Sequence, residues 1–484
     1  MQFDLDLAVP PKTSRTIVRD LHRQLREAIL AGRLLPGAQL PPSREFSAQY
    51  GVSRSTAMAV YDLLLSEGFL VARQGAGTFV AEKLRRPSAP SVAARQRRDP
   101  RLPRRAAAPS DDFATGASMS YAFDLRMGLP DKSAFPFDTW RRLSNHALRD
   151  LGKQPAAYLD PAGPEPFRNA ISTHVSFTRA VACNAESIVA TTGAQQAFDI
   201  IARALVESGK TVVAVEDPGY PPLRAAFESA GATVQPVPVD GEGMIIEKLP
   251  KNARIICVTP SHQFPTGVVM SLARRNSLLD FARRNGAVIV EDDYDSEFRF
   301  GGNPLDALQT LDRDGSVFYV GTFSKSLFPA LRLGFVAVPE WARDAIVAAK
   351  RVADWHSPAL PQLALASFIA EGHLVRHVRR MRKIYRKRRA TLETALAVHT
   401  AEWLTPVPSA AGLHLSAWFK GSIDEAKLQA ACAANGVGVE RISTYAMNNA
   451  RARVSLSATE PARMRRSKPR SCASQTRGRI FDMH

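Results

Sequence analysis

Four short apolar segments between residues 211 and 322 constrain the fold of this chain more than any other feature. They read TVVAVED (211–217), RIICVTP (254–260), AVIVEDD (287–293) and SVFYVGT (316–322); each ends in polar residues, and helical stretches separate them. Strands that alternate with helices form a parallel sheet that is buried on both faces. The sequence therefore predicts an α/β domain, and the ligands of such open sheets bind at the carboxyl ends of the strands.

A stretch rich in Pro, Ala, Ser and Arg divides the chain. Residues 83–118 show no apolar periodicity, which is typical of a flexible linker. The linker separates a small N-terminal domain (13–82) from a large C-terminal domain (119–461). Residues 462–484 are basic and aperiodic, so we expect this tail to be disordered.

Composition excludes several classes of protein. Apolar residues make up 45 % of the chain, which is ordinary globular material. The four cysteines lie far apart without a CxxC pair, so we expect reduced thiols and a cytoplasmic protein. No run reaches the roughly 20 apolar residues that a membrane span needs, and the acidic N-terminus is unlike a signal peptide.

The net charge of +18 suggests a nucleic-acid partner, but most of the surplus lies in the linker and the tail. A further basic run, RHVRRMRKIYRKRR, occupies 376–389. Its apolar residues Val378, Met381, Ile384 and Tyr385 recur at helical spacing, which favours a helix with one buried stripe and its bases in solvent. The alternative is a supporting role in holding DNA phosphates.

The N-terminal domain has the pattern of a helix-turn-helix. Apolar spacing predicts a helix over 17–31, a short helix over 44–50 capped by Ser43, and a third helix from Ser53 to about residue 67. In a helix-turn-helix the second of the two motif helices enters the major groove of DNA, and here this is the third predicted helix. Here that helix begins with Arg54, which can contact guanine edges or phosphate, and with the hydroxyls of Ser53, Ser55 and Thr56.

A hairpin follows the third helix. Residues 69–72 and 78–80 read as two short strands joined by a turn at Gly75 and Gly77, which carries Arg73 toward the DNA backbone as a wing. Helix-turn-helix patterns alone give many false positives. Here, however, LLPGAQLPPSREFSAQYGVSRSTAMAVYDLLLSEGFL and RQGAGTFV together resemble the GntR-type winged-helix domain. That resemblance implies double-stranded DNA as partner, contacts from Arg44, Arg54 and Arg73, and a wing shaped by Gly77.

A lysine follows the last of the four apolar segments, in GTFSKSLFPALRLGF. Lys325 could form a Schiff base, and Thr322, Ser324 and Arg332 could hold a phosphate. Taken alone, a lysine here is most often a surface residue. Asp292 at the end of another strand could keep a pyridine nitrogen protonated. The motif TTGAQQAFD opens a helix whose free N–H groups could bind phosphate.

In this order along the chain, the motifs resemble a fold-type I aminotransferase. Joined to the front domain, YLDPAGPEPFR, TTGAQQAFD, VEDPGYPPLR, TPSHQFPTG, VEDDYDSEFRF and GTFSKSLFPALRLGF resemble the MocR subfamily of GntR regulators. The resemblance implies pyridoxal 5′-phosphate linked to Lys325, with Asp292 on the pyridinium nitrogen. Tyr294 would bond the phenolic oxygen, and Tyr220 would stack on the ring. Its phosphate would be held by Gly193, Ala194, Gln195, Thr322 and Arg332.

The same resemblance implies a homodimer, in which Tyr158 reaches a phosphate of the partner subunit. His262 and the 265–267 loop would lie near the ring. The family also supplies an arginine that pairs with the carboxylate of an effector. Arg453 stands in about the right place, with Arg451 as a competitor. The basic tail departs from the family, which continues there with an amphipathic helix.

Two functions compete on these grounds. In the first, the protein is a DNA-binding transcriptional regulator that senses pyridoxal phosphate or an amine or amino-acid effector, and is not an enzyme. In the second, it is an aminotransferase with an appended DNA-binding module. We favour the regulator, because a catalyst needs no recognition helix. A vestigial cofactor site is a weaker third reading, since Lys325, Asp292 and Arg332 are all present.

Overall fold

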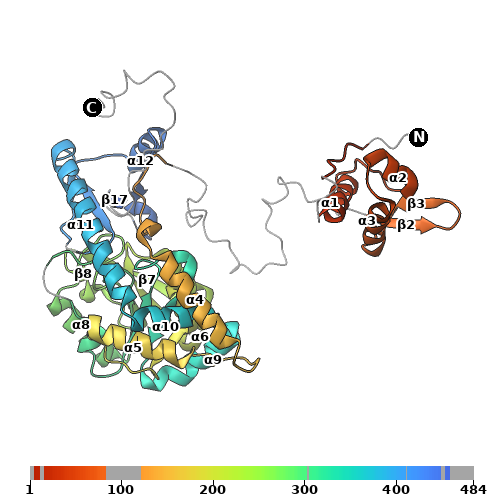
Figure 1. Ribbon diagram of the computed structural model, residues 1–484. Coiled ribbons are helices and arrows are strands. Elements are labelled where there is room, and N and C mark those ends of the chain that lie inside the picture. The colour runs from red at the N-terminus through yellow and green to blue at the C-terminus, as the bar shows by residue number, and fades with distance from the viewer. Residues whose placement is uncertain are drawn as a thin grey trace. The chain divides into compact units, whose positions relative to one another are not determined.

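The computed structural model describes residues 5–10, 16–82, 121–301, 305–409 and 411–448, and the backbone of 453–457. These residues belong to two compact units, one on each side of residue 106 (Figure 1). The predicted linker (83–118) and tail (462–484) lie outside the described residues, and the domain limits 13–82 and 119–461 remain predictions.

The N-terminal unit contains the predicted helix-turn-helix and wing. Its three helices are α1 (Ile17–Leu30), α2 (Ser43–Tyr50) and α3 (Arg54–Ser66). The wing consists of β2 (Leu70–Arg73) and β3 (Gly77–Val80), and β1 (Gln39–Leu40) pairs with β3 to complete a three-stranded antiparallel sheet. The core is made by side chains from all three helices, among them Leu21, Leu25, Phe46, Val60 and Leu64, none of which is exposed.

The caps of the two motif helices differ from the prediction at one position. The Ser53 hydroxyl caps α3 by accepting from the backbone N–H of Thr56 at 3.0 Å, as predicted. Ser43, however, is the first residue of α2 and caps nothing. Pro42 occupies the cap position in an extended conformation, and Gly51 ends α2 with φ of 63°.

The C-terminal unit is built on an eight-stranded sheet. The four predicted strands are present as neighbours that all run parallel, in the order β11-β10-β9-β6. Strand β12 was not predicted; it is antiparallel to β11 on one side and to β5 on the other. The full order is β5-β12-β11-β10-β9-β6-β7-β8. The bounds are β5 (Ile188–Thr191), β6 (Val212–Asp217), β7 (Thr233–Asp240), β8 (Gly243–Met244), β9 (Ala253–Val258), β10 (Val288–Asp293), β11 (Val317–Thr322) and β12 (Gly334–Ala337).

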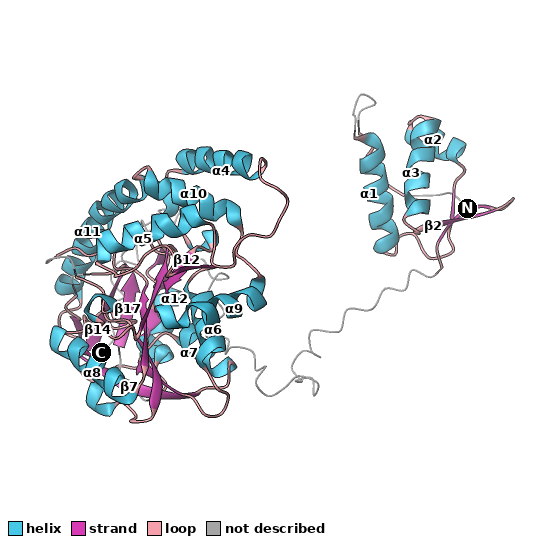
Figure 2. Ribbon diagram, turned by 90° about the horizontal axis from the view of Figure 1, so that it is seen from below, coloured by secondary structure: helices cyan, strands magenta, loops and turns pink. Residues whose placement is uncertain are grey.

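Helices cover both faces of this sheet (Figure 2). Successive residues of β11 point to opposite faces, so Phe318 and Val320 lie in one apolar cluster and Tyr319 in another. The first cluster is completed by α6, α7 and α9, and the second by α5 and α10. The bounds are α4 (Phe137–Leu151), α5 (Glu165–Arg179), α6 (Ala194–Leu205), α7 (Pro221–Ser229), α8 (Leu272–Asn285), α9 (Arg343–Asp354) and α10 (Ala359–Ala370).

A smaller sheet closes the unit. Strands β13 (Leu404–Pro406), β14 (His414–Phe419), β17 (Arg453–Ser457) and β16 (Glu440–Arg441) form it in that order, with α12 (Glu425–Ala434) nearby in the chain. Strand β4 (Phe123–Asp124), at the start of the unit, pairs in parallel with β15 (Val437–Gly438). Two segments far apart in the sequence therefore lie side by side.

The long helix α11 (His373–His399) contains the basic run. Val378, Met381 and Tyr385 are buried, as the helical spacing predicts. The prediction that the bases point into solvent is wrong for Arg389, which is 6 % exposed. Its guanidinium pairs with Glu393 at 2.8 Å and donates to two backbone carbonyls of the 409–411 segment. No helix among the described residues is long and apolar enough to cross a membrane.

Candidate functional site

Lys325 lies three residues beyond the end of β11, on the turn that leads to β12. Its Nζ donates to the backbone oxygen of Gly128 at 2.5 Å. Burial lowers the pKa of Lys325, although the nearby carboxylates of Asp295 and Asp292 act in the opposite direction. A lysine with a lowered pKa spends more time as the neutral amine, which is the nucleophilic form.

Asp292 stands at the end of the neighbouring strand β10 and is only 4 % exposed. Its Oδ1 has no hydrogen-bond partner among the described residues. Burial raises the pKa of Asp292 well above its usual value, and the charges of Asp293 and Asp295 add to the effect. An unpartnered buried carboxylate is costly unless a cation completes the site. The pyridinium nitrogen of pyridoxal phosphate is such a partner, so Asp292 fits this cofactor.

The two predicted tyrosines are placed differently. Tyr220 precedes α7, is 38 % exposed, and packs edge-on against Phe264 with ring centroids 5.3 Å apart. An exposed fraction of this size argues against ordinary core packing. The Tyr294 hydroxyl is 2.9 Å from Nδ1 of His262. Burial raises the pKa of Tyr294 well above its usual value, so the phenol remains protonated at neutral pH.

The predicted phosphate residues meet at the start of α6. Gly193 precedes this helix with φ of 85°, and a Cβ there would lie 3.0 Å from the guanidinium of Arg332. Arg332 donates to the backbone oxygen of Thr192 at 2.5 Å. An open hollow of about 390 Å³ is lined by Gln195 and Arg332 among others. Free N–H groups and a guanidinium beside a hollow suit an anion such as phosphate.

Three of the predicted phosphate residues also have a place in the local structure. Ala194 is the first residue of α6. The Thr322 hydroxyl donates to Ser324 Oγ at 3.0 Å and accepts from the Ser324 backbone N–H at 3.2 Å. The amide of Gln195 donates to the backbone oxygen of Pro222 at 2.9 Å. Thr322 therefore shapes the turn that carries Lys325, and Gln195 ties α6 to α7.

Tyr158 and Arg453 are not brought into this group. Tyr158 is 77 % exposed, and its ring lies 5.0 Å from that of Trp355. The backbone of Arg453 pairs with Trp418 in the small sheet, whereas its side chain and the competitor Arg451 lie outside the described residues. The role of Tyr158 toward a partner subunit and that of Arg453 toward an effector remain predictions.

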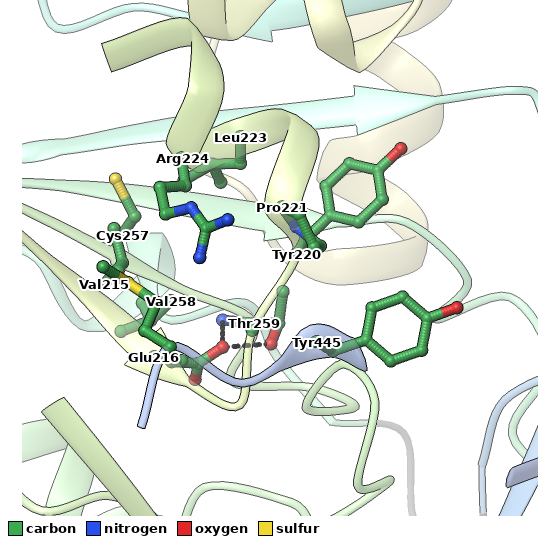
Figure 3. A pocket seen from close by; sticks show the side chains of 12 residues that line it. Val215, Glu216, Tyr220, Pro221, Leu223, Arg224, Cys257, Val258, Thr259 and Tyr445 are labelled. Atoms are coloured by element: carbon green, nitrogen blue, oxygen red, sulfur yellow. Dashed lines mark hydrogen bonds between the residues drawn. The ribbon is translucent and has the colours of Figure 1, made fainter. Parts of the chain in front are cut away.

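A separate small pocket shares Tyr220 with the predicted site but is not lined by Lys325 or Asp292 (Figure 3). Its volume of about 20 Å³ has room for about one water molecule. Within it, one oxygen of Glu216 accepts from the backbone N–H and the hydroxyl of Thr259. Burial raises the pKa of Glu216 to about 7. This pocket is too small for the cofactor.

Sequence reasoning missed several residues of the site. Of the acids in VEDDYDSEF, it singled out Asp292 alone. Asp293 pairs with the buried Arg179 at 2.7 Å, and Asp295 lies 3.1 Å from His262. The cluster of acids in one loop was a visible signal, but their partners lie far away in the chain. Gly128, which holds Lys325, carried no such signal.

The predicted DNA contacts lie on the surface of the N-terminal unit. Arg44, Arg54 and Ser55 are exposed at the starts of α2 and α3, and Thr56 is half-buried. The Ser53 hydroxyl is occupied by its cap. Arg73 pairs with Glu82 at 2.8 Å and lies over the ring of Phe79. Gly77 has φ of 111°, and a Cβ there would lie 2.9 Å from the amide of Gln39. These contacts remain predictions.

Known proteins match the chain in both units. Residues 17–80 match the gntR family of bacterial regulatory proteins, and residues 128–467 match the family of class I and II aminotransferases. The probable rhizopine catabolism regulatory protein MocR of Rhizobium meliloti is 38 % identical over 88 % of this chain and 86 % of its own. The pyridoxine biosynthesis transcriptional regulator PdxR of Corynebacterium glutamicum is 30 % identical over 86 % of each chain.

The second unit is similar in fold to solved structures of aminotransferases. The kynurenine aminotransferase of Pyrococcus horikoshii, in complex with PMP, superposes with a TM-score of 0.67 and 25 % identity, covering 76 % of this chain and 92 % of that one. A multiple substrate aminotransferase from Thermococcus profundus gives a TM-score of 0.68 at 25 % identity, covering 75 % and 93 %. The second unit thus has the fold-type I aminotransferase architecture.

Proposed function

We propose, because the chain belongs to the MocR subfamily of GntR-type transcriptional regulators, that its aminotransferase-like unit is a sensor. The sensor binds pyridoxal 5′-phosphate and responds to that cofactor or to an amine or amino-acid effector. The winged helix binds double-stranded DNA and carries the response to a promoter. The observation that carries the cofactor proposal is the unpartnered, buried carboxylate of Asp292, one strand away from Lys325.

The residues around Asp292 and Lys325 would each bind a different part of the cofactor. Asp292 would hold a proton on the pyridine nitrogen, and Tyr220 would cover the ring. Gly193, Ala194, Gln195, Thr322 and Arg332 would hold the phosphate. When bound, pyridoxal phosphate supplies an aldehyde with which an amine condenses. The lowered pKa of Lys325 suits it to compete with such an amine for that aldehyde.

The aminotransferase alternative uses the same groups. Lysine, aspartate and phosphate cradle would serve catalysis and sensing equally, so residual transaminase activity is compatible with the site. Two features favour sensing: the winged helix, and relatives that are named as regulators over most of both chains. The relative from Corynebacterium glutamicum is named for pyridoxine biosynthesis, which supports the cofactor itself as one candidate signal.

The DNA-reading surface would consist of the exposed start of α3 and the wing. Arg54 would contact base edges or phosphate, and Arg44 and Arg73 would contact phosphates. To reach phosphate, Arg73 would exchange its ion pair with Glu82. We also propose a homodimer, which supplies two winged helices for two half-sites. Tyr158 and Trp355 form an exposed aromatic pair that suits such an interface.

Binding of an effector can alter DNA affinity only if it favours one conformation of the protein over another. The test therefore measures the affinity of the full chain for DNA upstream of its own gene, with and without pyridoxal phosphate and a panel of amines and amino acids. We expect at least one of these to change the affinity by about fivefold or more. An affinity that ignores them all, together with turnover at ~1 per second or faster, would instead establish the aminotransferase.

A further inference from the structure

A chain of buried polar side chains leads away from Tyr294. His262 and Asp295 are 2 % and 1 % exposed. Nδ1 of His262 lies 3.1 and 3.2 Å from the two carboxylate oxygens of Asp295, and 2.9 Å from the Tyr294 hydroxyl. Asp295 also accepts from the backbone N–H of Leu413 at 3.2 Å.

The chemistry of Asp295 fixes the direction of these hydrogen bonds. A carboxylate can only accept, so the His262 nitrogen that faces it must carry the proton. That nitrogen then cannot accept from Tyr294, whose oxygen accepts from it instead. The proton of the Tyr294 hydroxyl is therefore left for a different acceptor.

The imidazole is held in this orientation by two glycines. A Cβ on Gly412 would lie 1.9 Å from Cε1 of His262, and one on Gly267 would lie 3.2 Å from Nε2. Gly412 has φ of 82° and, with Leu413, leads directly into β14 of the small sheet. The ring orientation therefore depends on the position of that sheet as well as on Asp295.

The same region can be read as a metal site, because atoms of His262, Asp295 and His414 lie within 4.8 Å of one another. Hydrogen bonds already engage one nitrogen of each histidine, whereas Nε2 of His262 has no partner among the described residues. Nδ1 of His262 already serves Asp295 and Tyr294, and Nε2 of His414 faces the backbone oxygen of Pro265 at 3.1 Å. Burial lowers the pKa of His414 to about 3, so it stays neutral.

We propose that His262, oriented by Asp295, is a positioning residue that keeps the Tyr294 hydroxyl as a donor to the phenolic oxygen of the cofactor. The inference rests on the proposed cofactor site and assigns a function to two residues outside it. The raised pKa of Tyr294 supports it, since a protonated phenol is required. The charged groups that act on Tyr294 are Asp292, Asp293, Asp295 and Glu216.

The experiment is a pH titration of the visible absorption of the cofactor-loaded full chain. A donor to the phenolic oxygen withdraws negative charge that stabilises the protonated nitrogen of the Lys325 linkage, so losing it raises the apparent pKa of the band. We expect His262→Leu to raise this pKa by about one unit. Asp295→Asn should do the same, because an amide N–H facing Nδ1 reverses the tautomer and makes Tyr294 donate to His262.

Rescue separates positioning from packing. His262→Asn places an amide N–H near the position of Nδ1 and should restore most of the original pKa. Tyr294→Phe should give the largest shift in the apparent pKa of the band, and this shift is the upper limit for the other variants. His377→Asn removes another buried histidine of the same unit and should leave the band unchanged. Thermal unfolding checks that each variant folds. If His262→Leu fails to fold, Asp295→Asn and His262→Asn are sufficient for the test.

Each other outcome contradicts a stated part of the argument. An unchanged pKa in His262→Leu and Asp295→Asn, beside a shift in Tyr294→Phe, overturns the positioning role and leaves the cofactor site intact. An unchanged pKa in Tyr294→Phe removes Tyr294 from the cofactor and overturns the inference with it. The absence of a visible band in the unaltered protein would remove the cofactor site itself.

Discussion

The two units place their candidate functional side chains in opposite environments. In the winged helix, Arg44 and Arg54 are exposed, and the backbone beneath them is fixed by Ser53 and Gly51. In the aminotransferase-like unit, Asp292 is buried and Tyr294 is half-buried, and the pKa of each is raised. A surface that reads DNA needs only correct placement, whereas a cofactor site stores unfavourable charge until its ligand arrives. The two kinds of site should therefore respond differently to substitution.

The largest effect is expected at Lys325, which is half-buried. Lys325→Ala should abolish the visible absorption that pyridoxal phosphate gives with the protein, because no other amine would form the linkage. DNA affinity without cofactor should stay within about twofold, since the winged helix is a separate compact unit. Absorption spectra and fluorescence anisotropy with labelled DNA measure the two properties. A persistent band would show that Lys325 is not the point of attachment.

At the exposed site, Arg54→Ala should weaken DNA binding by about 1–3 kcal/mol if the guanidinium makes a bidentate base contact. Cofactor absorption should not change, which makes it the internal control. Arg33→Ala is a matched variant, because it removes another exposed arginine of the same unit. Equal losses in both variants would mean that Arg54 contributes only general charge.

Asp292→Asn should make the unloaded protein more stable while it weakens cofactor binding. Removing a buried charge that lacks a partner should raise the free energy of unfolding at pH 8 by about 1–2 kcal/mol. A carboxyl whose pKa is raised on folding favours the folded state below its ordinary pKa, about 4, and this stability is lost as pH rises through the folded-state value.

The pH dependence therefore supplies the control for that variant. Glu291, whose pKa is raised to about 7 by burial, contributes equally in both proteins. The stabilisation by Asp292→Asn should shrink between pH 8 and pH 5 in denaturant titrations of the unloaded chain. A gain that is the same at both pH values would show that the charge of Asp292 is not its source.

The smallest effect concerns the caps. Ser53→Ala should destabilise the N-terminal unit by about 1 kcal/mol, because the first turn of α3 loses its side-chain acceptor. Ser43→Ala should lower the free energy of unfolding by only a few tenths of that amount, since Ser43 makes no cap hydrogen bond. Denaturation of the N-terminal unit, followed by circular dichroism, compares the two directly. Equal costs would contradict the assignment of Pro42 as the cap of α2.

Local signals explain most of what could be predicted. The Ser53 cap, the glycine turn at Gly51 and the four apolar segments each depend on neighbours in sequence, and the structure confirms them. The site could be predicted in part, because Asp292 and Lys325 follow strands whose ends meet at one edge. Their surroundings are non-local: Gly128 contacts Lys325 across 197 positions. Burial of Arg389 was missed for the same reason, since its carbonyl partners lie on a distant loop.

Strands β4 and β15 form a two-stranded sheet of their own, apart from the four-stranded small sheet. The backbone approaches Tyr121 closely here, because a Cβ on Gly438 would lie 2.6 Å from the Tyr121 ring. The guanidinium of Arg126 covers the same ring and grips Asp124. These contacts join β4, the first described strand of this unit, to β15. A displacement of β15 would therefore also displace β4, because the two strands share backbone hydrogen bonds.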